Sequence, residues 1–271
     1  MTNPLALHRV TAFNMAATSE NKIHDDAVAS RFGFRGALVP GVAVFGYMAH
    51  LPVARWGRAW LERGSAECRF VEPVYHGHDA VAQGTMQEDA VEIELHSDDR
   101  LCARGSAVLP PAAPEALPIE PDFDATPPHE RPPADESSLA EGTRLGIVPF
   151  VMTAEDTEQW LDDLRETDPI YRRERLAHPA TLLRAANWVL TQNVVLGPWI
   201  HVGSRVANFA ALPVGAELSA QARVTRNYLL KGHRFVELDI RLLLDGRRVA
   251  ARIGHTAIYV PRQVAEAALP H

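Results

Sequence analysis

The chain repeats itself across a proline-rich segment, and this repeat limits the folds that it can adopt. Phe70–Gln83 parallels Phe209–Gln221, because each begins with Phe and continues through Pro-Val, Gly and an acidic residue to Gln. Farther along, Arg100–Gly105 parallels Arg248–Ile253. An internal repeat of this kind indicates that the two halves share one structural plan.

The segment between the halves holds nine of the chain's 20 prolines, all between residues 110 and 133. Proline removes a backbone donor and fixes φ, so we expect an extended connector that crosses a domain surface. The predicted division is an N-terminal unit over residues 1–109, a linker over 110–142 and a C-terminal unit over 143–271.

Each half combines alternating segments with one apolar helical segment. Val91–His96 and Phe235–Leu242 place an apolar residue at every second position, which predicts antiparallel strands followed by tight turns at Asp98-Asp99 and Asp245-Gly246. The pattern alone therefore predicts an α+β chain with a repeat.

The expected helices run over Leu38–Arg63 in the first half and from about Ala180 to Leu196 in the second. Both are largely apolar, which favours burial inside a sheet rather than exposure on a surface. Pro52 should kink the first helix or split it in two.

Residues 19–41 carry the strongest chemical pattern. An Asn-x-Ile-His-x-Asp core (Asn21, His24, Asp26) is followed by Gly-Phe-x-Gly and then by a Pro-Gly step that ends at Gly41. An imidazole titrates near neutral pH, so His24 could move protons in an acyl pocket. A helix start at Gly41 would direct free backbone N–H groups at a thioester oxygen, with no Cβ in the way. The simpler interpretation is that His24 only braces a loop.

This pattern resembles the hydratase motif of the MaoC-like, (R)-specific enoyl-CoA hydratase family. The resemblance implies a double hotdog, in which two central helices pack against one continuous antiparallel sheet. It also implies hydration of an acyl-CoA thioester without a metal or other cofactor. On this resemblance the catalytic group comprises His24, Asn21 and the backbone of Gly41, and the substrate contacts are Val39, Pro40 and Asp26.

One position departs from the family pattern. Ser19 stands where the catalytic Asp is expected, and a hydroxyl is not a base near neutral pH. Three functions therefore remain open: a hydratase or dehydratase with altered or weak catalysis, a non-catalytic protein that binds an acyl-CoA or another lipid-like ligand, and an acyl-CoA thioesterase.

The second half has lost the motif. At the corresponding place, Glu166, Asp168 and Tyr171 stand at the family's Asp, Asn and His positions. We interpret this half as a degenerate copy that shapes the acyl channel, with Glu166 and Tyr171 as an alternative acid/base pair.

The bulk properties exclude several classes of function. A net charge of −7 argues against a nucleic-acid partner, although Arg172–Arg175 forms a local basic cluster. Two cysteines are too few for a disulfide framework, and the sequence has neither a signal-peptide pattern nor an apolar run of membrane-spanning length. The expected protein is cytoplasmic, without a membrane partner. A homodimer of double-hotdog chains is compatible with the resemblance.

Overall fold

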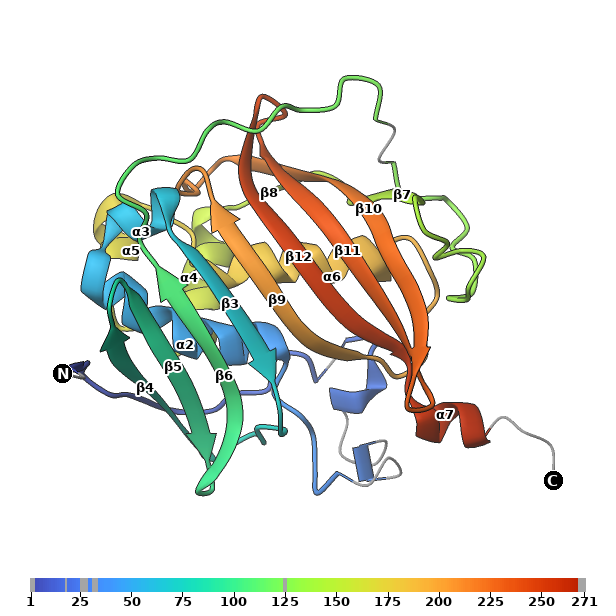
Figure 1. Cartoon of the computed structure of the whole chain (residues 1–271), viewed down its shortest axis with the longest axis horizontal. Helices are drawn as coiled ribbons and strands as arrows, with labels where there is room; N and C mark the ends of the chain where they lie inside the picture. Colours follow the sequence, from blue (N-terminus) through green and yellow to red (C-terminus); the bar gives the residue numbers. More distant parts are fainter. Residues whose placement is uncertain (1–2, 18, 25–28, 31–33, 124–125, 268–271) are drawn as a thin grey trace.

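One antiparallel sheet of 12 strands wraps around two central helices (Figure 1). The computed structural model describes residues 3–17, 19–24, 29–30, 34–123 and 126–267. Along the main path the strand order is β1-β4-β5-β6-β3-β9-β12-β11-β10-β7. The principal strands of the N-terminal half are β3 (Ser65–Phe70), β4 (Asp79–Gln87), β5 (Ala90–Ser97) and β6 (Arg100–Val108). Those of the C-terminal half are β9 (Ile200–Asn208), β10 (Glu217–Leu230), β11 (His233–Leu244) and β12 (Arg248–Val260).

The strand order confirms the internal repeat. Outward from the centre, the first half runs β3-β6-β5-β4 and the second runs β9-β12-β11-β10, so corresponding strands occupy corresponding places. The halves join where β3 pairs antiparallel with β9, from Ser65 opposite Ala207 to Arg69 opposite Gly203. The predicted turns at Asp98-Asp99 and Asp245-Gly246 connect β5 to β6 and β11 to β12.

Short strands cover both edges of the sheet. At one end β1 (Asn3–Pro4) and β2 (His8–Thr11) pair with β4, and at the other β7 (Arg144–Gly146) and β8 (Phe150–Val151) pair with β10.

The first central helix, α2 (Gly41–Trp56), is buried on nearly all sides, as its apolar sequence predicts. The prediction that Pro52 splits it was wrong, because Pro52 lies inside α2 and the break falls at Gly57. Gly57 adopts φ 57° and ψ −140°, which a residue without Cβ accommodates, and the chain then starts α3 (Arg58–Arg63).

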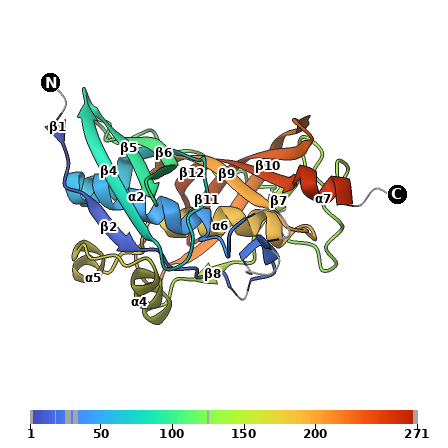
Figure 2. The ribbon, with the colours of Figure 1, turned by 90° about the horizontal axis from the view of Figure 1, so that it is seen from below.

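The second central helix, α6 (Ala180–Thr191), packs against α2 beneath the sheet (Figure 2). It ends at Thr191, earlier than the predicted Leu196. Further helices among the described residues are η1 (Lys22–His24), α4 (Ala154–Asp163), α5 (Ile170–Glu174) and α7 (Arg262–Ala267). Among the described residues, no helix has the length and apolarity needed to cross a membrane.

The described residues of the predicted linker form no helix or strand, and its middle part lies against the C-terminal half. The backbone N–H of Glu120 donates to the side chain of Gln221 on β10, which donates back to the Glu120 carbonyl at 2.8 Å. The Glu120 carboxylate also accepts from Arg223 at 2.5 Å and lies 3.0 Å from Arg241. The part of the linker around Glu120 is therefore attached to β10 and β11.

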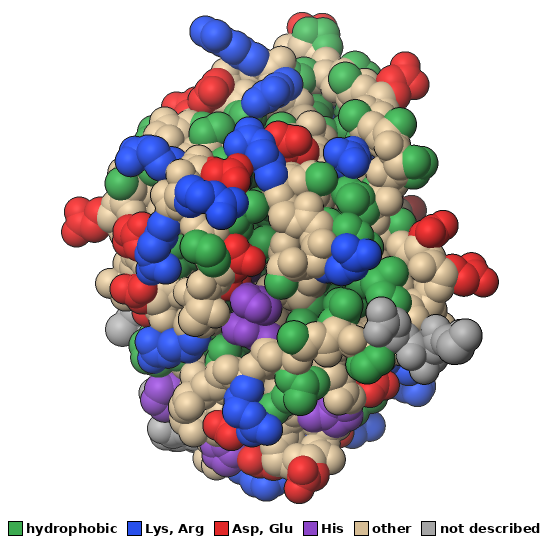
Figure 3. All heavy atoms as spheres, turned by 90° about the vertical axis from the view of Figure 1, so that its left-hand side faces the viewer, with side chains coloured by type: hydrophobic (Ala, Val, Ile, Leu, Met, Phe, Trp, Pro, Cys, Tyr) green, Lys and Arg blue, Asp and Glu red, His purple; other side chains and the backbone are tan. Residues whose placement is uncertain are grey.

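The basic cluster predicted from the sequence is neutralised by neighbouring acids. Arg172 pairs with Glu158 and Asp162, and Arg173 pairs with Glu174. The face of the molecule at this end mixes charges of both signs (Figure 3). Two of the cluster's three arginines, Arg172 and Arg173, therefore have carboxylate partners of their own.

Candidate active site

A cavity of about 1050 Å³ lies between the two halves. Its walls come from the loop that carries the His24 motif, the start of α2, one face of α6, the start of β9 and the linker. The lining residues used below are Ser19, Glu20, Asn21, His24, Val39, Pro40, Gly41, Val42, Phe70, Arg131, Trp160, Arg184, Asn187, Trp188, Thr191, Trp199 and His201.

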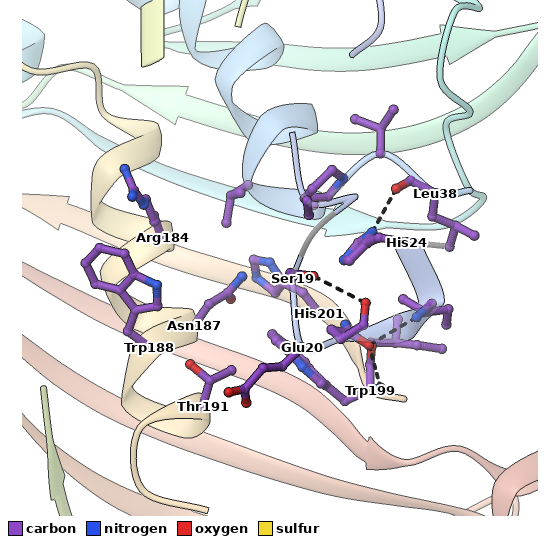
Figure 4. Close-up of a pocket in the computed structure, with 18 of the residues that line it drawn as sticks. Ser19, Glu20, His24, Leu38, Arg184, Asn187, Trp188, Thr191, Trp199 and His201 are labelled. Carbon is purple, nitrogen blue, oxygen red and sulfur yellow. Dashed lines mark hydrogen bonds between the residues drawn. The ribbon is translucent and has the colours of Figure 1, made fainter. Parts of the chain in front are cut away.

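The imidazole of His24 has a fixed orientation in this cavity. Its Nδ1 lies 2.8 Å from the carbonyl oxygen of Leu38, so Nδ1 carries the hydrogen and Nε2 is left as the free acceptor (Figure 4). The side chain of Asn14 donates to the His24 carbonyl at 2.9 Å, which anchors the backbone. Burial lowers the pKa of His24, and the Leu38 contact opposes that shift only in part. Neutral imidazole is therefore the resting form near pH 7.

Asn21 connects the motif loop to the other half of the chain. Its Nδ2 donates to the Trp199 carbonyl at 3.0 Å, and its Oδ1 accepts from the Trp199 and Ile23 N–H groups at 3.3 and 3.4 Å. An amide can both donate and accept, which a carboxylate at this position could not do. Asn21 thus positions the turn that carries His24.

The side chains of Ser19 and Glu20, which are adjacent in the motif loop, bind different partners. The Ser19 hydroxyl donates to the Asn21 carbonyl at 3.3 Å, and the Glu20 carboxylate lies 2.9 Å from the Arg131 guanidinium of the linker. Arg131 also donates to the Thr191 carbonyl at 2.6 Å. Glu20 therefore ties the loop to the linker and α6, and it does not replace the missing carboxylate beside His24.

The start of α2 supplies backbone donors. Val39 donates its N–H to Val74 and Pro40 has none, whereas the N–H groups of Gly41 and Val42 have no acceptor in the described part of the chain. A Cβ at Gly41 would lie 2.9 Å from the Phe70 ring, so only glycine fits here without displacement.

The sequence reasoning missed the wall formed by α6. Arg184, Asn187, Trp188 and Thr191 lie across the cavity from His24 (Figure 4). Arg184, Asn187 and Thr191 are spaced three and four residues apart, so they share one helix face. This spacing of polar residues could have indicated a polar face on the helix, but the apolar residues of the opposite face dominate the pattern.

A second missed group lies behind Gly41. His201 Nε2 is 2.9 Å from the Ser204 hydroxyl, which is 3.0 Å from His255 Nδ1. Burial drives the pKa of His201 well below its usual value and lowers the pKa of His255 to about 3, so both rings are neutral. His201 Nδ1 and His255 Nε2 have no partner among the described residues.

A buried His–Glu–His cluster joins the degenerate motif of the second half, through Glu166 and His178, to His50 on α2 of the first half. Glu166 Oε1 lies 2.8 Å from His50 Nδ1, and Oε2 lies 3.3 Å from His178 Nε2. Burial opposes ionisation of Glu166, but the hydrogen bonds from the two histidines outweigh it and hold the pKa of Glu166 far below its usual range. The hydroxyl of Tyr171 is buried and has no partner in the described ranges. Glu166 and Tyr171 thus form no hydrogen-bonded acid/base pair.

The predicted site residues His24, Asn21, Ser19, Val39, Pro40 and Gly41 all line the one cavity. Asp26 lies outside the described residues. Glu166 and Tyr171 are absent from the lining of this cavity. In the described ranges, no three or more His, Cys, Asp or Glu side chains are grouped to hold a metal ion.

Solved structures share this architecture. A MaoC-like dehydratase superposes with a TM-score of 0.60 at 11% identity, over 95% of this chain and 97% of the other. A conserved Mycobacterium tuberculosis protein with a double hotdog fold gives 0.62 at 12% identity, over 95% of each chain. The tesB protein of Mycobacterium avium subspecies paratuberculosis gives 0.50 at 14% identity, over 83% of this chain and 88% of the other.

These likenesses establish the fold: the chain is a double hotdog, as predicted. No protein-family model matches the sequence, and no curated protein matches it.

Proposed function

We propose that the chain hydrates 2-enoyl thioesters, or dehydrates the corresponding 3-hydroxyacyl thioesters, with His24 as the acid and base. The observation that carries the proposal is the orientation of His24. Its Nδ1–H is fixed on the Leu38 carbonyl, its pKa is lowered by burial, and its Nε2 is the remaining acceptor in a cavity that also receives the start of α2.

In the hydration direction, neutral His24 accepts a proton at Nε2 from a water molecule as the water oxygen bonds to C3 of the substrate. The C2–C3 π electrons move towards the thioester, and the charge that develops on its oxygen is stabilised by the N–H groups of Gly41 and Val42. His24 then returns the proton to C2. The sum is addition of one water across the double bond, with His24 restored.

One observation favours the second candidate, a non-catalytic acyl-thioester binding protein. No carboxylate hydrogen-bonds to the His24 ring in the described residues, because Ser19 bonds to the loop backbone and Glu20 bonds to Arg131. A hydratase built on His24 alone should be slower than one with a cooperating carboxylate, since paired catalytic groups act as a unit.

The test is incubation with crotonyl-CoA and longer 2-enoyl-CoAs, with loss of the conjugated double bond and product identity as the measurements. We expect hydration that falls by about 100-fold or more in His24→Ala, the scale of general acid–base catalysis. His96→Ala, on β5 and outside the cavity lining, is the matched control and should keep wild-type activity.

The pH profile adds a second measurement. The working form of His24 is neutral and its pKa is lowered, so activity should persist at pH values below the ordinary histidine pKa of about 6.5 and fall only on more acidic titration. Release of free thiol without hydration would instead identify a thioesterase. Both cysteines are buried, which keeps the background of a thiol reagent low. Saturable binding without turnover would identify a binding protein, and either result would overturn the proposal.

A further inference from the structure

Arg184 is held between two indole rings in the cavity wall. Its guanidinium carbon lies 4.8 Å from the ring centroid of Trp160, on α4, and 4.6 Å from that of Trp188, one turn along α6. Two aromatic faces fix the planar guanidinium and leave its edge of N–H donors free to bind. Such a clamp reduces the entropy lost when a ligand is bound.

The guanidinium has no hydrogen-bond acceptor or carboxylate partner in the described part of the chain. By contrast, Arg172, Arg223 and Arg252 each pair with an acid within 3.0 Å. Arg184 nevertheless lines the cavity and is half-buried, and burial lowers its pKa without discharging it.

The two acidic residues that influence Arg184 electrostatically hydrogen-bond to other side chains. Asp156 and Asp163, both on α4, influence Arg184 electrostatically. The first accepts from the Thr153 hydroxyl at 2.6 Å, and the second accepts from Gln159 at 2.9 Å. A half-buried cation without a bonded anion is costly, so its retention in a cavity points to a ligand that completes the pair.

The rest of this helix face is also polar. Asn187 and Thr191 line the cavity beyond Arg184, and the amide oxygen of Asn187 is buried without a partner among the described residues. Figure 4 shows this face directed at the space that His24 adjoins. A purely hydrocarbon acyl chain would leave the N–H donors of Arg184 unsatisfied, whereas the Asn187 oxygen is an acceptor and needs an N–H or O–H of the ligand rather than a carboxylate.

We propose that Arg184 binds an anionic group of the ligand, and that this group is a carboxylate on the acyl portion, so that the substrate is a monothioester of a dicarboxylic acid. That the bound thioester is a substrate rests on the proposed function, whereas the proposal that Arg184 binds an anion does not. Phosphates of the thioester carrier share the same chemistry. The acyl carboxylate is favoured because Arg184 lies on a central helix, across the cavity from His24, next to the rings of Trp160 and Trp188.

The experiment measures binding by calorimetry with saturated thioesters, which have no double bond to hydrate. Dicarboxylic monothioesters from succinyl to adipoyl are each compared with the monocarboxylic thioester of equal length, both as coenzyme A and as phosphate-free pantetheine thioesters. Wild-type protein should prefer the dicarboxylic member at one or more lengths. Arg184→Gln should reduce that preference by about 10- to 100-fold, the range for a hydrogen bond to a charged group.

Arg184→Lys keeps the charge but loses the planar fork, so it should give an intermediate preference. Arg226→Gln is the matched control, because Arg226 also stacks on an aromatic ring, Tyr228 at 4.5 Å, but lies outside the cavity lining. Its ligand preference should equal that of wild type.

Three results would overturn the inference. The first is an equal affinity of wild-type protein for both members of every pair. The second is a preference that Arg184→Gln leaves unchanged. The third is that Arg184→Gln weakens the binding of coenzyme A thioesters but not of pantetheine thioesters, whatever the acyl group. That result would assign the site to a phosphate of the carrier. Because these thioesters are not hydrated, each result stands whether or not crotonyl-CoA is turned over.

Discussion

Replacement of Glu166 by Gln tests whether the buried His–Glu–His cluster braces the fold or performs chemistry. Glu166 Oε1 accepts from the N–H groups of Thr167 and Asp168, each at 2.7 Å, and from His50 at 2.8 Å. His178 Nδ1 accepts from the Ala180 N–H at 3.1 Å, so its Nε2 carries the hydrogen and donates to Glu166 Oε2. The carboxylate thus accepts four hydrogen bonds.

The amide of Glu166→Gln can keep the three bonds at one oxygen, but its NH₂ then faces the N–H of His178. One bond to a charged group is lost, worth about 1.5–3 kcal/mol, and the other three lose their charge assistance. We expect a total loss of about 3–5 kcal/mol in the free energy of unfolding, from the lost bond together with the weakening of the other three. A loss of 1 kcal/mol lowers the Tm of a chain of about this size by roughly 2–4 °C, so the Tm should fall by roughly 6–20 °C.

The pH dependence has a definite sign. The folded-state pKa of Glu166 lies below its unfolded value of about 4.3, so its stabilisation is fully present above that value and is lost as pH falls through the folded pKa. The difference in unfolding free energy between wild type and Glu166→Gln should therefore be constant across neutral pH and shrink as the pH falls below about 4.3.

Thermal unfolding with a parallel crotonyl-CoA assay distinguishes the two roles of Glu166. The control is Glu158→Gln, which removes an exposed ion pair with Arg172 and should change the unfolding free energy by about 0.5 kcal/mol or less. A Tm equal to that of wild type would refute the brace. Loss of activity with an unchanged Tm would show that the second half contributes to catalysis.

Two further substitutions examine the cavity. Gly41→Ala places a Cβ 2.9 Å from the Phe70 ring and 3.0 Å from His201 Nδ1, and should cost about 1–3 kcal/mol in urea unfolding, whereas Gly197→Ala, with open space around it, should cost little. Ser19→Asp should raise crotonyl-CoA hydration by supplying a carboxylate on the His24 loop, and the gain should vanish when His24→Ala is added. A folded Ser19→Asp protein no more active than wild type would indicate a cavity rebuilt for another ligand.

The sequence predicted the architecture because the fold depends on periodicity. Alternation identified β5 and β11, and the repeat placed two helices inside one sheet. The same periodicity could not place the first helix break, because Pro52 is tolerated within α2 while Gly57 takes a backbone conformation that ends the helix.

The sequence pointed to candidate residues only within one segment. His24, Asn21 and Gly41 are close in sequence, and all three line the cavity. Arg184 and His201 come from the other half, and nothing in their local sequence signals a partner more than a hundred residues away. Their role depends on the β3–β9 junction and on the packing of α6 against α2, which the motif does not encode.

Joining two hotdog units in one chain also releases each unit from symmetry. Arg184 is the fifth residue of α6, and the fifth residue of α2 is Phe45, which is 2% exposed in the core. In a dimer of identical subunits every residue occurs twice in equivalent surroundings. An arginine in one cavity would then also occur in the equivalent cavity of the partner. In a fused chain the two central helices are encoded separately. A charged residue can therefore evolve on α6 while α2 stays apolar.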